Sequence, residues 1–137
     1  MTTTGYSGTP LAKKLGIKAG DTILAIDAPE DYRDWLSPLP ENVSITTKAR
    51  AGSHGIVHLF APMMADIERN LTQARQAMTR SGAFWVSWYK KSAKIPTDIT
   101  EDRIRERLLK TDLVDVKVCA VSEVWSGLKF VVRKNLR

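Results

Sequence analysis

The sequence is poor in the residues that staple small extracellular proteins and build metal centres. Its single cysteine, Cys119, excludes an internal disulfide, and the two histidines, His54 and His58, stand in no pattern with metal-ligand spacing. We therefore expect no metal, and the cytoplasm is the default location. Cys119 and His58 fall inside apolar strand patterns, where a buried small residue and a hydrogen-bonded core histidine are the expected roles, while His54 is expected in a loop.

Long apolar runs are absent as well. No stretch approaches the roughly 20 residues that a transmembrane helix needs, and the segment from Met1 to Gly5 shows no signal-peptide pattern. We therefore expect no membrane partner. With 137 residues, of which 43% are hydrophobic and 26% charged, the chain is expected to form one globular domain over residues 1–137.

Acidic residues are too few to balance the basic ones, and the imbalance lies in one half of the chain. Residues 1–60 hold 6 Lys/Arg and 6 Asp/Glu, whereas residues 61–137 hold 15 and 9, which gives the net charge of +6. A basic excess favours anionic partners, so nucleic acid is one hypothesis. No nucleic-acid-binding motif accompanies the charge, and most of it is expected to be solvated surface.

Apolar runs bounded by turn residues predict the strands. Several runs are short and apolar throughout, which is typical of strands buried on both faces of a parallel sheet. The last two runs alternate, and only Ser122 to Val124 separates them, so they are expected to form an antiparallel hairpin. The six expected strands are 22–27, 43–47, 56–61, 83–88, 113–121 and 125–133.

Caps and apolar spacing predict helices between these strands. Thr9 is the expected N-cap of a short helix that Gly16 ends, and Pro29 opens a second helix. A third helix carries apolar residues three and four apart, and Ser81-Gly82 is expected to stop it. Its predicted buried face consists of Met64, Ile67, Leu71, Ala74 and Met78.

A fourth helix is predicted after the N-cap Thr100, with Ile99 and Ile104 placed as a hydrophobic staple. The alternation of strands and helices predicts an α/β fold with a Rossmann-like, mainly parallel sheet and helices on both faces. With the closing antiparallel hairpin, the pattern resembles the class I methyltransferase variant of the Rossmann fold. The predicted topology is therefore methyltransferase-like.

Four sequence blocks carry a closer resemblance: GYSGTPLAKKLGIK, WVSWYKK, PTDITED and VDVKVCAVSEVWSGLK. On these blocks the chain resembles, from Gly5 nearly to its end, a bacterial family known as the domain of unknown function numbered three-zero-five-two. The family pattern has Pro where this chain has Tyr89 and Asp where it has Ser122. The resemblance implies a small Rossmann-like protein without an established activity.

The residues that hold S-adenosylmethionine in methyltransferases are missing. The resemblance implies a Gly-rich turn after the first strand and an acidic residue at the end of the second. Here the first strand runs into Asp27 and Pro29 without a glycine, and the second reaches Lys48 without a carboxylate. No dinucleotide-binding GxGxxG follows any strand. We therefore expect no cofactor, and the sequence argues against S-adenosylmethionine-dependent methyl transfer.

The strand ends supply a candidate ligand site. In open α/β sheets, ligands bind outside the carboxyl ends of the strands, and the lysine pair after residues 83–88 belongs to that edge. The alternative is that Trp85 and Trp88 pack on opposite faces of their strand and that the lysines are only solvated. A second candidate, an anion nest in the segment Gly5 to Gly8, competes with a simple N-terminal arm, which we favour. The candidate ligand-binding residues are Trp88, Lys90, Lys91, Thr97, Asp98 and Asp27.

Three functions follow from these observations. The favoured one is a non-catalytic binding or regulatory module for a small anionic ligand or a protein partner. The first alternative is an enzyme that uses the strand-end site, with Asp98 or Asp27 as acid or base and Lys90 or Lys91 as electrostatic stabiliser. The second is nucleic-acid binding through the basic second half. The sequence itself assigns no catalytic residue.

Overall fold

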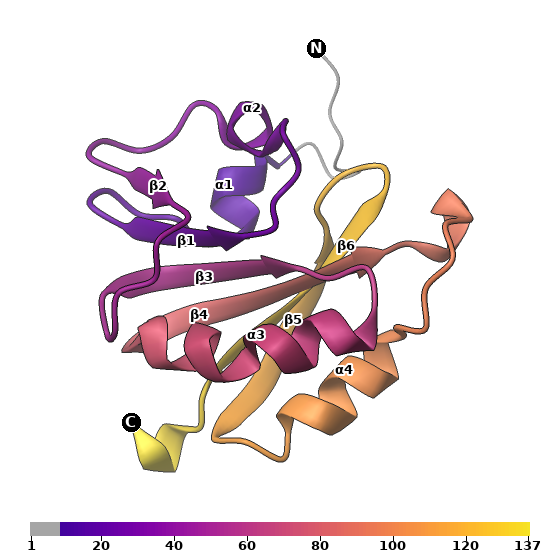
Figure 1. Ribbon diagram of the computed structural model, residues 1–137. Coiled ribbons are helices and arrows are strands. Elements are labelled where there is room, and N and C mark those ends of the chain that lie inside the picture. Colours follow the sequence, from indigo (N-terminus) through magenta and orange to yellow (C-terminus); the bar gives the residue numbers. More distant parts are fainter. Residues whose placement is uncertain (1–8) are drawn as a thin grey trace.

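The computed structural model describes residues 9–137, which build a six-stranded sheet (Figure 1). The segment Gly5 to Gly8, for which an N-terminal arm was favoured over an anion nest, lies outside the described residues. The strands are β1 (Thr22–Ile26), β2 (Ser44–Thr46), β3 (His54–Phe60), β4 (Met78–Tyr89), β5 (Leu113–Ala120) and β6 (Trp125–Val132). Their order is β2-β1-β3-β4-β6-β5, with parallel pairing from β2 to β4 and antiparallel pairing of β6 with both neighbours. The predicted fold class is confirmed.

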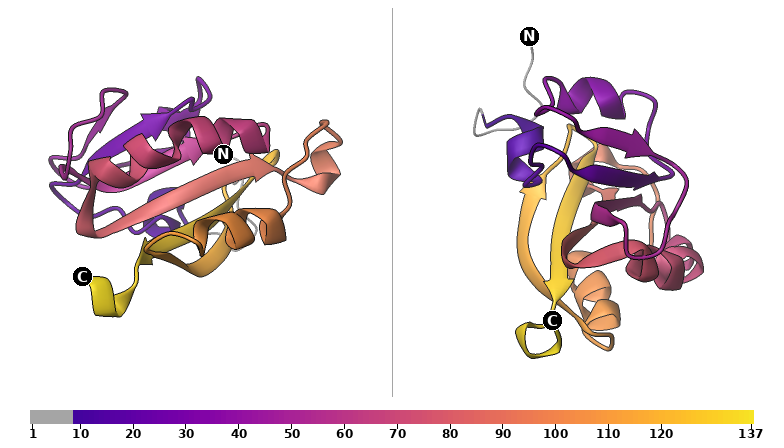
Figure 2. Two further views of the ribbon diagram at one scale, coloured as in Figure 1. Left: turned by 60° about the horizontal axis from the view of Figure 1, so that its bottom comes forward. Right: turned by 90° about the vertical axis from the view of Figure 1, so that its left-hand side faces the viewer.

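Helices cover both faces of this sheet, as predicted (Figures 1 and 2). One face carries α3 and α4, whose side chains form one buried cluster with the sheet. The other carries α1 and α2, which contribute to a second cluster. The helices are α1 (Leu11–Lys14), α2 (Tyr32–Leu36), α3 (Met64–Ala77) and α4 (Glu101–Leu108), and short 3-10 turns span Lys91–Ala93 and Lys134–Leu136.

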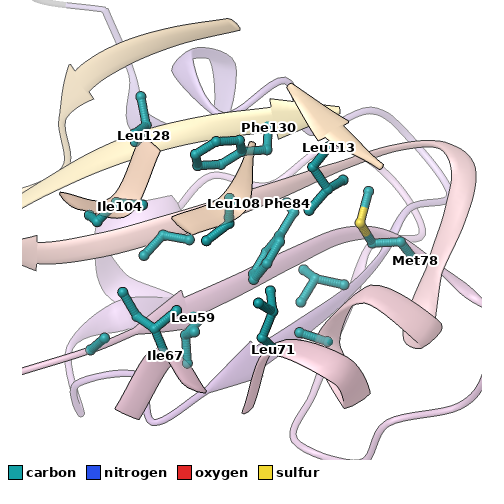
Figure 3. Close-up of a cluster of buried hydrophobic side chains, with 14 of the residues drawn as sticks. Leu59, Ile67, Leu71, Met78, Phe84, Ile104, Leu108, Leu113, Leu128 and Phe130 are labelled. Carbon is teal, nitrogen blue, oxygen red and sulfur yellow. The ribbon is translucent and has the colours of Figure 1, made fainter. Parts of the chain in front are cut away.

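The strand β4 separates the two clusters because its successive side chains point to opposite faces. Phe84 packs under α3 and α4, where Figure 3 shows it beside Leu71 of α3 and Leu108 of α4. Trp85 is fully buried on the other face, and its indole N–H donates to the carbonyl of Leu15 at 3.2 Å. Trp88 returns to the α3 and α4 face. The two tryptophans therefore pack on opposite faces, as the alternative interpretation of the strand predicts.

The boundary between α3 and β4 differs from the prediction. The helix ends at Ala77, not at Ser81-Gly82, because Met78 already has extended backbone angles and pairs with β3. Residues Met78 and Ala83 pair with His54 and Ile56, so the residues between them form an irregular, looped-out part of the strand. Long-range pairing overrides the local helix pattern here. His54 is likewise wrongly predicted in a loop, because it is the buried first residue of β3.

At the other three helices, the predicted first residues are correct for α4 and wrong for α1 and α2. The hydroxyl of Thr100 accepts a hydrogen bond from the backbone N–H of Arg103 at 3.1 Å, so the predicted cap of α4 is confirmed. At α1 the N-cap position belongs to Pro10, without a side-chain hydrogen bond, and α2 begins only at Tyr32, after Pro29. No helix of residues 9–137 has the length and apolar character needed to cross a membrane.

Candidate functional site

The strand order reverses beside β1. From β1 the chain moves to β2 at one side and then crosses to β3 at the other, and both neighbours run parallel to β1. In open α/β sheets, a crevice forms outside the carboxyl ends of the strands at this point, because the connections leave in opposite directions. The carboxyl end of β1 is therefore the position at which a ligand site is expected in this fold.

A cavity of about 330 Å³ lies at this position. The end of β1, the segment after β2 and the helix α3 form its walls. Small alanine side chains leave the space open, and Asp27, Thr47 and Gln73 bring a carboxylate, a hydroxyl and an amide to it. The lining residues are Leu24, Ala25, Ile26, Asp27, Ala28, Thr47, Ala49 and Gln73.

The turn after β1 is tight although it contains no glycine. Asp27 adopts a left-handed backbone conformation, with φ of 56°. Aspartate enters this region more readily than most residues, because its short polar side chain can bond locally. Pro29 lies beyond the turn and does not line the cavity beside Asp27. The conformation that glycine usually supplies is thus present, and the proline does not fill the space.

A second cavity, of about 240 Å³, lies on the other side of the same turn. Ala28 lines the first cavity and Pro29 the second, so the two share the turn as a wall. The second cavity is mainly aromatic and apolar, and the ring of Trp125 lies 4.3 Å from that of Tyr89, centroid to centroid. Its lining residues are Pro29, Trp35, Ser122, Glu123, Val124 and Trp125.

The predicted site residues lie near the carboxyl edge of the sheet, but the structure does not bring them together in one site. Asp27 lines the first cavity, whereas Trp88 is 7% exposed and packs in the α3 and α4 cluster. Thr97 donates a hydrogen bond to the carbonyl of Pro62, and the Asp98 carboxylate accepts one from the backbone N–H of Met64 at 2.8 Å. Thr97 and Asp98 therefore hold the turn between β3 and α3.

The two predicted lysines follow β4. The backbone N–H of Lys90 donates to the carbonyl of Val124 at 2.8 Å, which ties the end of β4 to the turn between β5 and β6. Lys91 is exposed and begins the 3-10 turn. Neither lysine lines either of the two cavities described at this edge. A role of this pair in ligand binding remains a prediction.

His58 is the hydrogen-bonded core histidine that the sequence predicts, and with two partners that the sequence did not reveal it holds α2 against the sheet. Tyr32 Oη lies 2.8 Å from His58 Nδ1, and His58 Nε2 lies 2.7 Å from Ser87 Oγ. All three residues are buried, and burial lowers the pKa of His58 to about 3 and raises the pKa of Tyr32. The neutral imidazole links β3 and β4 to the helix after the β1 turn. The histidine inside an apolar strand was the signal in the sequence that two polar partners must lie nearby, because both of its ring nitrogens need a hydrogen-bond partner when buried.

Solved structures that are similar to this fold include several methyltransferases. A Sulfolobus solfataricus protein assigned to the type 11 methyltransferases has a TM-score of 0.64 at 9% identity, over 96% of this chain and 94% of its own. A SAM-dependent methyltransferase from Aquifex aeolicus gives 0.63 and 14%, over 90% and 88%. A chain of the complex between the Haloferax volcanii Trm112 methyltransferase activator and its methyltransferase gives 0.61 and 11%, over 89% and 86%. Neither a family model nor a curated protein matches the sequence.

These likenesses show the methyltransferase-like Rossmann fold, while the closer resemblance to the three-zero-five-two family remains a prediction. They also correct the functional preference. The favoured non-catalytic module, and the argument against an enzyme, are contradicted by the methyltransferase neighbours, which cover nearly the whole chain. The enzyme alternative is the better supported. The physical error lay in requiring glycine itself, since Asp27 supplies its backbone conformation and Pro29 stands outside the cavity.

Proposed function

We propose that this chain is an enzyme that takes S-adenosylmethionine as its methyl donor. The observation that carries the proposal is the cavity of about 330 Å³ at the carboxyl end of β1, where the strand order reverses. Its size falls within the range of small-molecule sites, on the order of 300–1,000 Å³. The likeness to methyltransferases over nearly the whole chain supports the same conclusion.

The residues around this cavity fit the cofactor. The Asp27 carboxylate is exposed at the turn and would accept hydrogen bonds from the hydroxyl or amino groups of the cofactor. Ala28 and Ala49 leave room for the ligand beside the backbone, and Thr47 and Gln73 offer further polar groups. When bound, the cofactor supplies a methyl group on a positively charged sulfur. A carboxylate at this position also complements that charge.

The second cavity is the proposed place of the methyl acceptor. It adjoins the first across the turn of Ala28 and Pro29, so a ligand there would lie beside the cofactor. Trp35 and Trp125 favour a flat acceptor, because aromatic faces bind rings and cations by stacking. Lys91 at the same edge remains a candidate for contacting an anionic group of the acceptor. A protein partner also remains a proposal, supported by the activator complex of the Haloferax neighbour.

Calorimetric titration with S-adenosylhomocysteine tests the cofactor site. We expect saturable binding by the unmodified protein and a loss of about tenfold or more in Asp27→Asn, which removes one charged hydrogen-bond acceptor. Asparagine tolerates the left-handed backbone, so the turn is kept. Asp31→Asn is the matched control, because Asp31 is exposed in the same connection and lines neither cavity. Absence of saturable binding at millimolar ligand by folded protein would refute the proposal.

A further inference from the structure

The largest of the cavities described lies at the opposite edge of the sheet. Its volume is about 460 Å³, and it is bounded by the turn after α1, the amino ends of β1, β3 and β4, and one residue of β6. In Figure 1 these strand ends are opposite the arrowheads of β1, β3 and β4. The cavity is therefore separate from the site at the carboxyl ends, and the proposed function makes no use of it.

Lys18 and Lys129 line this cavity, and the exposed Lys117 lies next to Lys129 on the neighbouring strand. Lys129 of β6 lines it and is partly buried, and within residues 9–137 its side chain has neither a hydrogen-bond partner nor a salt bridge. Lys117, its partner on β5, and Lys18 are close enough that their charges add to burial in lowering the pKa of Lys129. Like charges in a partly desolvated place repel one another. The arrangement is one that a bound anion would stabilise.

The one carboxylate that lines the cavity, that of Asp21, is held by the backbone of its own turn. Asp21 Oδ2 accepts a hydrogen bond from the backbone N–H of Lys18 at 2.7 Å, and Asp21 Oδ1 faces Gly55, where an added Cβ would lie 3.1 Å away. Within the described chain this carboxylate forms no ion pair with Lys129. Lys18, Lys129 and the neighbouring Lys117 outnumber this single carboxylate, so basic side chains are in excess at the cavity.

The irregular start of β4 gives the cavity a polar wall. Between Met78 and Ala83 the strand loops out of register, which places Thr79 and Ser81 at the cavity. Gly82 permits this path, because a Cβ there would lie 2.8 Å from both the Gly55 carbonyl and Thr79 Oγ1. Hydroxyl groups beside ammonium groups are hydrogen-bond donors suited to phosphate oxygens.

We propose that this cavity binds a small phosphate-bearing molecule. Lys129, Lys18 and Lys117 would neutralise the phosphate, and Thr79 and Ser81 would donate hydrogen bonds to its oxygens. Phosphate fits better than a single carboxylate, because one compact phosphate group carries more than one charge and more acceptor atoms. The concave shape favours a small molecule over a nucleic-acid strand, which would need an extended basic surface.

Titration with inorganic pyrophosphate at low salt tests the proposal. We expect saturable binding that weakens by about tenfold or more in Lys129→Met, the loss expected for one charge-assisted hydrogen bond. Methionine keeps the apolar stem of the side chain. Lys110→Met, at an exposed lysine after α4, is the matched control and should bind like the unmodified protein. Equal binding by both variants would overturn the proposal.

Three further measurements make the result decisive. Without ligand, Lys129→Met should unfold at no lower temperature than the unmodified protein, because the substitution removes repulsion between lysines. If this variant fails to fold, Lys18→Met, at an exposed position, replaces it and should also weaken pyrophosphate binding. Lys129→Met should keep S-adenosylhomocysteine binding, and Asp27→Asn should keep pyrophosphate binding. A failure of one proposal can then be distinguished from a failure of the other. A short single-stranded DNA that binds more tightly than pyrophosphate, and depends on Lys129, would overturn the small-molecule assignment.

Discussion

The two faces of the sheet are built from different chemistry. Under α3 and α4 the buried cluster is formed by apolar side chains from Leu24 to Val132 (Figure 3). Under α1 and α2 the packing is aromatic and carries buried polar groups, namely the Tyr32, His58 and Ser87 chain and the indole N–H of Trp85. A close-packed apolar core is sensitive to changes in side-chain volume. A satisfied network of buried hydrogen bonds fixes the relative orientation of the elements that it links. We infer that the first face mainly stabilises the fold and that the second mainly positions α2 beside the site.

Truncating a side chain of the apolar face should have the largest effect. Leu71 of α3 is 6% exposed and packs against Phe84, as Figure 3 shows. Leu71→Ala should lower the free energy of unfolding by about 2–5 kcal/mol, because it leaves a cavity that the cluster fills only in part. Urea unfolding measures the loss. Gln76→Ala, at an exposed position of the same helix, is the control and should change it by less than about 0.5 kcal/mol.

Breaking the polar chain tests the second face. Tyr32→Phe removes the hydroxyl that lies 2.8 Å from His58 Nδ1 and leaves that nitrogen buried without a partner. We expect a loss of about 1–3 kcal/mol of unfolding free energy. Because α2 would be held less firmly beside the β1 turn, S-adenosylhomocysteine binding should weaken as well. A variant that loses stability but keeps full affinity would contradict the positioning role and leave the proposed cofactor site intact.

The buried chain of Tyr32, His58 and Ser87 gives the second face a pH dependence that the buried apolar side chains of the first face lack. Burial lowers the pKa of His58 from 6.5 to about 3, so the unfolded protein takes up a proton that the folded protein does not. Stability should therefore be complete well above pH 6.5 and fall as the pH drops towards 3, by about 1.4 kcal/mol per pH unit.

Thermal unfolding across this range measures the slope, and His58→Gln should flatten it. The flattening should be partial, because the pKa of His54 is also lowered, by burial and by the charge of Arg50. An unchanged slope in His58→Gln would mean that His58 is not buried in its neutral form.

The smallest effect is expected at the rim of the apolar face. Arg75 of α3 donates to both carboxylate oxygens of Asp112, just before β5, at 2.7–3.1 Å. Hydrogen bonding by Arg75 lowers the pKa of Asp112, but both side chains are partly exposed and the pair is screened. Asp112→Asn should cost no more than about 1 kcal/mol in urea unfolding. A loss as large as that of Leu71→Ala would show that the rim holds α3 as strongly as the apolar cluster does.

Several features could be read from the sequence because neighbouring residues decide them. The alternation within a strand places Trp85 and Trp88 on opposite faces, and the Thr100 cap needs only residues within one helical turn. The short connection after Cys119 fixes the hairpin of β5 and β6. From these signals the fold class follows without coordinates, and the carboxyl edge of the sheet is the predicted place of a ligand site.

Other features depended on residues far apart in the chain, so only the tertiary structure decided them. Pairing with His54 and Ile56 pulled Met78 to Gly82 out of the helical pattern and opened the amino-end cavity. The partners of His58 come from positions 26 residues before and 29 after it, which no local pattern predicts. The left-handed turn at Asp27 depends on where the packed sheet and α2 hold its two ends. The absence of glycine after β1 could therefore be seen in the sequence, but the left-handed conformation of Asp27, which takes the place of that glycine, could not.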